Sequence, residues 1–142
     1  MPIEPVRVRF ATPDDLAFVS QGSGIAPEVM RRKIDAREVV VAGRGGRSVG
    51  HARLEYLWST IPYLALIRVL DGERRTGVGR ALLRFIEAFL QKQGHAVLYS
   101  SSQVDEPEPQ AWHRHVGFAE CGIIAGINPG GVGEVFFRKQ LG

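Results

Sequence analysis

The 142-residue sequence contains a single cysteine, Cys121. One cysteine cannot form a disulfide within the chain, and such scarcity is typical of a reducing compartment, so we expect a cytoplasmic location. We expect Cys121 to be a small apolar side chain that is buried or half-buried. The first residues, Met1–Pro5, lack the basic and apolar segments of a secretory signal.

Long hydrophobic runs are also absent, so the sequence predicts no membrane span. Neither sign of charge dominates, because 18 Lys and Arg against 15 Asp and Glu give a net charge of +3. The basic residues stand in small groups and do not alternate with aromatic residues, as they would on a base-stacking surface. Nucleic-acid binding is therefore disfavoured, while a polyanionic small molecule suits this charge equally well.

Hydrophobic residues make up 44% of the chain and charged residues 23%, as in ordinary soluble globular proteins. A chain of this length predicts one domain, residues 1–142, with a substantial core. The periodicity predicts a strand, two short helices, three strands, a helix, a strand, a helix and two strands. This order indicates a mixed α/β (α+β) fold with helices on both faces of a sheet of about seven strands.

The expected elements follow from alternation, three-and-four spacing and turn residues. Strands are expected at residues 6–10, 38–43, 48–58, 63–70, 96–100, 117–124 and 134–139, and helices at 16–21, 27–36, 78–93 and 110–115. Residues 101–109 are expected to form a polar turn punctuated by prolines. The glycines of residues 22–24 predict a flexible connection over which a substrate could enter.

The stretch Leu64–Leu83 organises the chain. It reads as a buried strand, a turn with two arginines and two closely spaced glycines, and then an amphipathic helix. A glycine turn at a helix start is suited to an anion, because free backbone N–H groups and the positive end of the helix dipole meet there.

Three phosphate-binding patterns compete for this turn. A P-loop requires Gly-Lys-Ser/Thr after four intervening residues, and no such run exists. A dinucleotide fingerprint requires a third glycine after Gly77 and Gly79, but Leu82 stands at that position. It also requires an acidic residue about twenty positions later, where residues 100–102 are serines. The third pattern fits, since residues 74–79 match Q/R-x-x-G-x-G/A.

This pattern resembles the acyl-CoA diphosphate loop of the GNAT (Gcn5-related) N-acetyltransferases. The predicted order of elements is the order of that fold along the whole chain. A second similar region lies near the end, where Trp112 stands at the usual Phe/Leu position and Gly117-Phe118 at the usual Gly-Phe. His113 stands where the family usually has tyrosine.

The resemblance implies that acetyl-CoA is the acyl donor. Its diphosphate would be held by the loop and the helix start: Arg74, Arg75, Thr76, Gly77, Val78, Gly79 and Arg80. In this fold the fourth and fifth strands splay apart, and the pantetheine arm lies in the gap. Backbone groups of Val69 and Leu70 would then face the pantetheine and the thioester carbonyl.

The resemblance also implies direct attack on the thioester by a primary amine of a small molecule or peptide. His113 would protonate the leaving thiolate, or would only hydrogen-bond near the sulfur. Glu55 is the first candidate for the general base, and its alternative is an outward-facing carboxylate. A water chain held by Ser101, Ser102 or Gln103 would serve the same purpose.

Further predictions concern the acceptor and the assembly. Tyr56, Trp58 and Tyr63 could line an acceptor pocket, although aromatic residues on strands are more often part of the core. Glu73 is expected to face water or to offset the loop arginines. No metal site is expected, and a homodimer is compatible with the resemblance. The competing function is a GNAT-like module that binds CoA or a protein partner without turnover.

Overall fold

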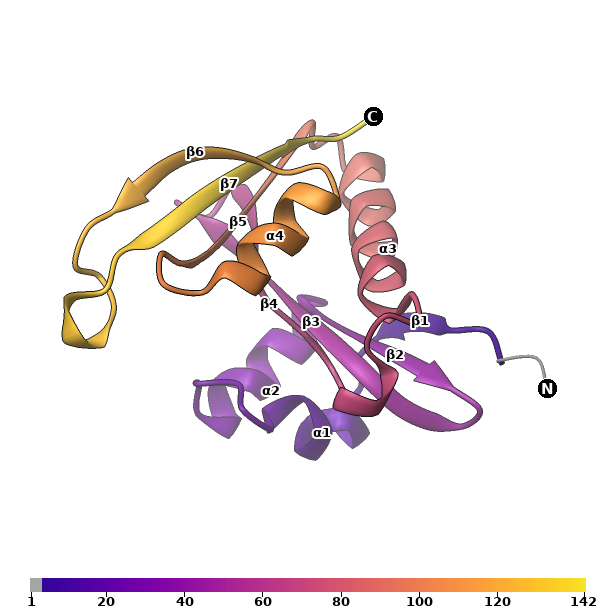
Figure 1. Ribbon diagram of the computed structural model, residues 1–142. Helices are drawn as coiled ribbons and strands as arrows, with labels where there is room; N and C mark the ends of the chain where they lie inside the picture. Colours follow the sequence, from indigo (N-terminus) through magenta and orange to yellow (C-terminus); the bar gives the residue numbers. More distant parts are fainter. Residues whose placement is uncertain (1–3) are drawn as a thin grey trace. The chain divides into compact units, whose positions relative to one another are not determined.

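The computed structural model describes residues 4–142, so residues 1–3, which begin the segment predicted to lack a secretory signal, lie outside it. The strands are β1 (Arg7–Phe10), β2 (Val39–Arg44), β3 (Arg47–Leu57), β4 (Ile61–Val69), β5 (Val97–Gln103), β6 (Ala119–Ile124) and β7 (Glu134–Gln140), and the helices are α1 (Leu16–Ser20), α2 (Pro27–Asp35), α3 (Val78–Lys92) and α4 (Pro107–His115) (Figure 1). This is the order predicted from the sequence.

The strands form a mixed sheet in the order β1-β2-β3-β4-β5-β7-β6. Pairings of β1 with β2, β2 with β3, β5 with β7 and β6 with β7 are antiparallel, whereas β4 and β5 are parallel. The parallel register joins Tyr63 to Tyr99 and Leu64 to Ser100. The predicted fold class is confirmed.

The chain divides into two compact units. The first, called here the N-terminal unit, comprises residues 1–55 and 66–89. The second, called the C-terminal unit, comprises residues 56–65 and 90–142.

In the N-terminal unit, helices cover both faces of the strands because adjacent strand residues point in opposite directions. Val39 and Val41 of β2 join a buried apolar cluster with α1 and α2. The ring of Phe10 on β1 faces the other side and packs edge-on against Phe85 and Phe89 of α3, with ring centroids 5.2 and 5.0 Å away. The three-and-four spacing of apolar residues in α3 therefore produces the predicted buried stripe.

In the C-terminal unit, β5 and β6 flank β7 (Figure 1). Leu98 of β5 and Phe137 of β7 are fully buried, and α4 contributes the buried His113. Every residue of β6 is exposed, as befits the last strand of the sheet.

The structure corrects three local predictions. Ser101–Gln103 continue β5 instead of forming a turn, because they pair with residues 134–136 of β7. Trp58 is not in a strand: it adopts a positive φ of 51° after the end of β3, and it is 83% exposed. Cys121 is exposed and not buried, because it lies on the edge strand β6.

The helix α4 also begins earlier than predicted, at Pro107, which suits the first helical position. Within residues 4–142, none of the helices combines the length and the apolar character that a membrane crossing requires.

Candidate active site

The loop after β4 is anchored to its own unit by main-chain hydrogen bonds. The N–H of Leu70 donates to the carbonyl of Val49 on β3, at 2.9 Å, and the N–H of Glu73 donates to the carbonyl of Leu70 at the same distance. A short turn of 3-10 helix, Asp71–Glu73, then reverses the chain. These two hydrogen bonds and the 3-10 turn fix the path of the chain from β4 into the loop.

Two arginines of the β2–β3 hairpin hold the second half of the loop. Nη2 of Arg44 donates to the carbonyl of Thr76 at 3.2 Å. Arg47 forms an ion pair with the buried Glu73 at 3.2 Å, so Glu73 offsets an arginine outside the loop instead of Arg74 or Arg75. The hydroxyl of Thr76 donates to the carbonyl of Glu73 at 2.5 Å, which closes the turn.

The backbone before α3 is shaped to receive an anion. Gly77 has a φ of 90°, and no atom beyond Gly77 and its two chain neighbours lies within 4 Å of the position that a Cβ would take. The first bond of the helix runs from the N–H of Ala81 to the carbonyl of Gly77, at 3.0 Å. The N–H groups of residues 78–80 precede this bond, and helix geometry leaves them without helical partners. The open space at Gly77 thus adjoins unpaired donors and the positive end of the dipole.

Charged side chains lie before Gly77 in the loop and on the first turn of α3. Arg75 is exposed and also has a positive φ, of 63°. Arg74 is exposed and forms an ion pair with Asp71 at 3.3 Å, and Arg80 is exposed on the first turn of α3. The guanidinium groups supply charge and forked donors for phosphate oxygens. Of the seven residues predicted to hold the diphosphate, 74–80, Arg74, Arg75, Gly77 and Arg80 are exposed, while Val78 is buried, and their role stays a prediction.

The backbone groups of Val69 and Leu70 face opposite edges of the strand. The N–H and carbonyl of Leu70 are both used within the chain, by Val49 and Glu73. Because neighbouring strand residues direct their N–H groups to opposite sides, the N–H of Val69 points away from β3. Of the two predicted backbone contacts, the N–H of Leu70 is already bonded within the chain.

His113 lies in the interior of the C-terminal unit, where it is 4% exposed. Its ring stacks on Phe137 with centroids 4.6 Å apart and an angle of 4°, and it meets Phe118 edge-on. Burial lowers the pKa of His113 below its ordinary value, although a hydrogen bond with the Pro109 carbonyl and the charge of Glu134 raise it. The imidazole is therefore neutral at pH 7.

Both ring nitrogens of His113 have partners. Nδ1 lies 2.7 Å from the carbonyl of Pro109, which can only accept, so Nδ1 carries the proton. Nε2 then accepts from the hydroxyl of Ser100, also at 2.7 Å. The same hydroxyl lies 3.0 Å from the carbonyl of Leu64. When Nε2 is protonated, it donates to the hydroxyl oxygen of Ser100, and the serine hydroxyl donates to the carbonyl of Leu64 instead. His113 and Ser100 therefore stay hydrogen-bonded in both protonation states of the imidazole.

Glu55, the candidate base, lies at the end of β3 within the N-terminal unit. Its Oε2 lies 3.3 Å from Nε of the buried Arg53 and 3.9 Å from Nζ of Lys33. The carboxylate is 37% exposed. It is therefore a partly outward-facing, ion-paired carboxylate, and its role as a base stays a prediction.

Another polar cluster was not predicted from the sequence. The phenol oxygen of Tyr63 lies 2.5 Å from Oγ of Ser101, which donates to Oε2 of Glu134 at 2.6 Å. The amide of Asn128 donates to the other oxygen of Glu134 at 2.9 Å. Tyr63 and Ser101 are candidates for a pocket and a water chain, but nothing in the sequence marks Glu134. The register of β5 and β7 pairs Glu134 with Gln103, and this pairing cannot be read from the sequence.

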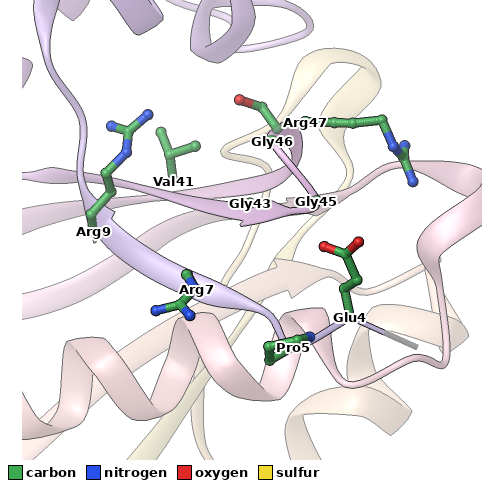
Figure 2. Close-up of a pocket in the computed structure, with 10 residues that line it drawn as sticks. Glu4, Pro5, Arg7, Arg9, Val41, Gly43, Gly45, Gly46 and Arg47 are labelled. Atoms are coloured by element: carbon green, nitrogen blue, oxygen red, sulfur yellow. The ribbon is translucent and has the colours of Figure 1, made fainter. Parts of the chain in front are cut away.

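A shallow cavity of about 580 Å³ lies at β1 and the β2–β3 turn. Figure 2 shows Arg7 and Arg9 on one side of it and Arg47 on the other, beside the glycine turn. Arg9 forms two hydrogen bonds with Asp15, and Arg47 is paired with Glu73, so carboxylates offset much of the charge. None of the residues predicted for the active site lines this cavity.

The other two residues predicted to line a pocket, Tyr56 and Trp58, differ in their surroundings. Tyr56 lies near His95, with ring centroids 6.1 Å apart, while Trp58 faces solvent. No group of three or more His, Cys, Asp or Glu suited to a metal ion occurs among the described residues.

A family model described as the acetyltransferase (GNAT) family matches residues 13–118, well over half of the chain. The protein therefore belongs to the GNAT acetyltransferase family. A curated relative, streptothricin acetyltransferase from Streptomyces lavendulae, is 31% identical over 102 residues. The match covers 70% of this chain and 53% of the relative, so the chain spans about half the length of that protein.

Solved structures agree on the fold. Ard1 from Thermoplasma volcanium superposes with a TM-score of 0.85 at 17% identity, over 96% of this chain and 97% of that one. The structure of yncA from Salmonella typhimurium, which contains its cofactor acetyl-CoA, gives a TM-score of 0.82 at 16% identity, over 97% and 95%. At identities this low, the superpositions establish the shared fold alone.

Proposed function

We propose that the protein transfers an acetyl group from acetyl-CoA to a primary amine. The observation that carries this proposal is the shape of residues 70–80, an anion-binding turn at the start of α3 in a chain of the GNAT family. The open space at Gly77, the unpaired helix donors and the exposed arginines fit a diphosphate. Acetyl-CoA is a donor substrate in this proposal, and no metal is needed.

Several weak contacts share the task of holding the donor. The helix dipole contributes only about 0.3–1 kcal/mol to anion binding at an exposed helix start. Charge-assisted hydrogen bonds from Arg75 and Arg80, and backbone N–H groups from Gly77 to Arg80, supply the rest. The ion pairs and hydrogen bonds of Arg44, Arg47 and Glu73 keep these donors in place before the substrate arrives.

The chemistry requires no enzyme nucleophile, because the amine attacks the thioester carbonyl directly. The N–H of Val69, which alternation directs away from β3, is the backbone donor that we assign to the pantetheine or to the oxygen that becomes negative in the tetrahedral intermediate. His113 is the acid of this proposal: it takes a proton from water at Nε2, which is directed at the hydroxyl of Ser100, and passes it to Ser100 as the serine gives its own proton to the leaving thiolate. Glu55 is the base that the sequence favours.

A primary amine of a small molecule is the acceptor class we favour. The 31% identical relative is named for streptothricin, which makes this compound the first acceptor to test. Peptides with a free amino terminus are the second class. A cytoplasmic location and a homodimer remain parts of the same proposal.

A second candidate function rests on His113 itself. This residue replaces the tyrosine of the family, and its buried ring has a partner on each nitrogen. A protein that binds CoA without turnover would retain the diphosphate loop and would use His113 only to pack α4 on β5 and β7.

One experiment separates the two functions. Acetyl-CoA binding is measured by calorimetry, and release of the CoA thiol is then followed with streptothricin, polyamines and short peptides. Saturable binding with amine-dependent thiol release supports the transferase. Tight binding with no release from any amine would establish the binding module, and absence of binding would refute both.

A further inference from the structure

The carboxylate of Glu134 lies at the start of β7, inside the C-terminal unit. Its two oxygens have different donors: Oε2 accepts from the hydroxyl of Ser101 at 2.6 Å, and Oε1 accepts from the amide of Asn128 at 2.9 Å. The same amide lies 3.4 Å from the carbonyl of Gly133, the residue before Glu134. Both donors are neutral, so they orient the carboxylate without cancelling its charge.

Glu134 differs in this respect from four carboxylates elsewhere in the chain. These four are also buried or half-buried, but each forms an ion pair with an arginine or a lysine: Asp15, Glu38, Glu55 and Glu73. Within residues 4–142, no Lys or Arg nitrogen lies at ion-pair distance from the half-buried Glu134. The imidazole of His113 senses the charge of Glu134, but burial keeps this ring neutral at pH 7. Because charges that are sheltered from water are usually paired, Glu134 is suited to pair with a cation from outside the chain.

The loops beside Glu134 contain no base. Residues 104–109 include three acids and no Lys or Arg, and residues 125–133 have no charged side chain at all. The two loops meet where the N–H of Val104 donates to the carbonyl of Gly133, at 2.9 Å. The local charge around Glu134 is therefore negative in a chain whose net charge is +3, and it favours the approach of a cation.

Aromatic rings lie on the same face of the sheet as this carboxylate. Phe136 is two residues farther along β7, and residues two apart on a strand point to the same side. The ring of Tyr63 stacks on Phe136, with centroids 5.9 Å apart and an angle of 25°, and its oxygen is bonded to Ser101. A carboxylate and an aromatic face both attract an ammonium or guanidinium group, whereas neither attracts an anion. The surroundings of Glu134 therefore select for organic cations.

We propose that Glu134 binds a cationic group of the acceptor, so that the preferred acceptor is a primary amine with a second ammonium or guanidinium group. This inference rests on the proposed transferase function and narrows its acceptor class. Glu134 determines specificity: it pairs with the second cation, while the amine that is acetylated is a different nitrogen of the same molecule. Ser101 and Asn128 are positioning residues that act through Glu134.

The contribution of this contact follows from its chemistry. Ser101 and Asn128 already hold the carboxylate in place, so binding a cation requires little further ordering. A charge-assisted hydrogen bond in such a position changes an affinity by about tenfold or more. No covalent bond forms or breaks at Glu134, so the contact is expected to affect KM and not kcat.

The test compares amines that differ in the second cation. Cadaverine and pentylamine share one carbon chain, and agmatine ends in a guanidinium group. In an assay of CoA thiol release, the wild-type kcat/KM is expected to be about tenfold or more higher for each dication than for pentylamine. Glu134→Gln keeps the shape of the side chain and removes its charge. It is expected to lower kcat/KM about tenfold or more for the dications, through KM, and less than about twofold for pentylamine.

Two further variants separate charge recognition from a loss of packing. Glu120→Gln is the matched control: Glu120 lies on β6 of the same unit, is exposed and pairs with Arg114, so the net charge changes equally. It is expected to leave the preference for cadaverine over pentylamine unchanged. Glu134→Lys is expected to reverse the preference, so that aminovalerate, which carries a carboxylate, becomes a better acceptor than cadaverine. A purely structural role of Glu134 would lower the rate with every amine alike.

Calorimetry gives a readout that does not require turnover. Cadaverine is titrated into protein saturated with CoA, which is unable to donate an acetyl group. The Kd is expected to be about tenfold or more higher for Glu134→Gln than for the wild type and for Glu120→Gln.

The outcomes separate this inference from the proposed function. If the wild-type protein acetylates no amine, the transferase function is refuted, and the role of Glu134 toward the acceptor is refuted with it. If the wild-type protein acetylates amines but uses cadaverine and pentylamine equally well, only the role of Glu134 is overturned. The same conclusion follows if Glu134→Gln and Glu120→Gln have equal effects, or if cadaverine binds Glu134→Gln with the Kd of the wild type.

Discussion

Nε2 of His113 lies 2.7 Å from the hydroxyl oxygen of Ser100, inside the C-terminal unit. Ser101, the next residue on β5, points to the opposite face and is bonded to Tyr63 and Glu134. Alternation along one strand thus separates two polar chains. One of them contains His113, the group proposed to deliver a proton.

His113→Phe tests the acid. Phenylalanine preserves the stacking on Phe137 but removes the bonds to Ser100 and Pro109, so unfolding becomes easier by about 1–2 kcal/mol. If His113 donates through Ser100, kcat falls about 100-fold or more and the affinity for acetyl-CoA is unaffected. His113→Tyr restores a donor of the family type, and steady-state kinetics of both variants compare the two. Unchanged kcat in a folded His113→Phe variant would remove this residue from the mechanism.

Gly77→Asp tests the diphosphate loop. The aspartate places a like charge in the open space beside the helix donors and adopts an unfavourable φ of 90°. We expect the Kd of acetyl-CoA to rise about 100-fold or more, equivalent to roughly 3 kcal/mol, measured by calorimetry. Gly94→Asp is a matched control, since Gly94 has a φ of 89° and equally open space beyond the other end of α3. Equal affinities for both variants would argue against the loop assignment.

Arg44→Met tests how far the loop depends on its support. Arg44 is buried and donates to the Thr76 carbonyl, but its Nε has no hydrogen-bond partner. Methionine fills similar space. Its lack of a buried, unpaired Nε offsets part of the free energy lost with the hydrogen bond to Thr76. We expect acetyl-CoA to bind about tenfold more weakly, with a change in unfolding free energy below about 1 kcal/mol. A variant that unfolds readily and yet binds normally would show that Arg44 serves stability instead.

His51 predicts an acid-sensitive stability. Burial, with the charges of Arg68 and Arg53, lowers the pKa of His51 from 6.5 to about 4. The unfolded chain therefore binds more protons than the folded chain between these values, and the free energy of unfolding falls as the pH falls from 6.5 to 4. Integrated over this window the loss is on the order of 3 kcal/mol, and it is complete below pH 4.

Denaturant unfolding at pH 7 and pH 4 measures this loss. His113 contributes in the same direction, because its pKa is also lowered by burial. The His51→Phe variant isolates the part due to His51, since phenylalanine keeps a ring beside Phe18 and cannot titrate. Equal pH dependence in the variant and the wild type would show that His51 is not responsible.

The sequence predicted the order of elements because apolar periodicity in β2, β3 and α3 reports directly on burial. Glycine spacing before an amphipathic helix also predicted the turn before α3, whose role in holding an anion stays a prediction. It misjudged Ser101–Gln103, since three polar residues after a buried strand resemble a turn until β7 pairs with them. The hydrogen bonds of Ser101 to Tyr63 and Glu134 span 38 and 33 residues, and local patterns contain no information about such separations.

The exposure of Cys121 has a consequence for any measurement of turnover. The chain has one thiol, on a strand where every side chain is exposed, so thiol reagents can reach it. Partial burial raises the pKa of Cys121 above its ordinary value, which slows its reaction by reducing the thiolate fraction. Each enzyme molecule therefore adds one slowly reacting equivalent to the thiol that acetyl transfer releases. Cys121→Ser would leave CoA as the only thiol counted, and the same position offers a single site for attaching a fluorophore.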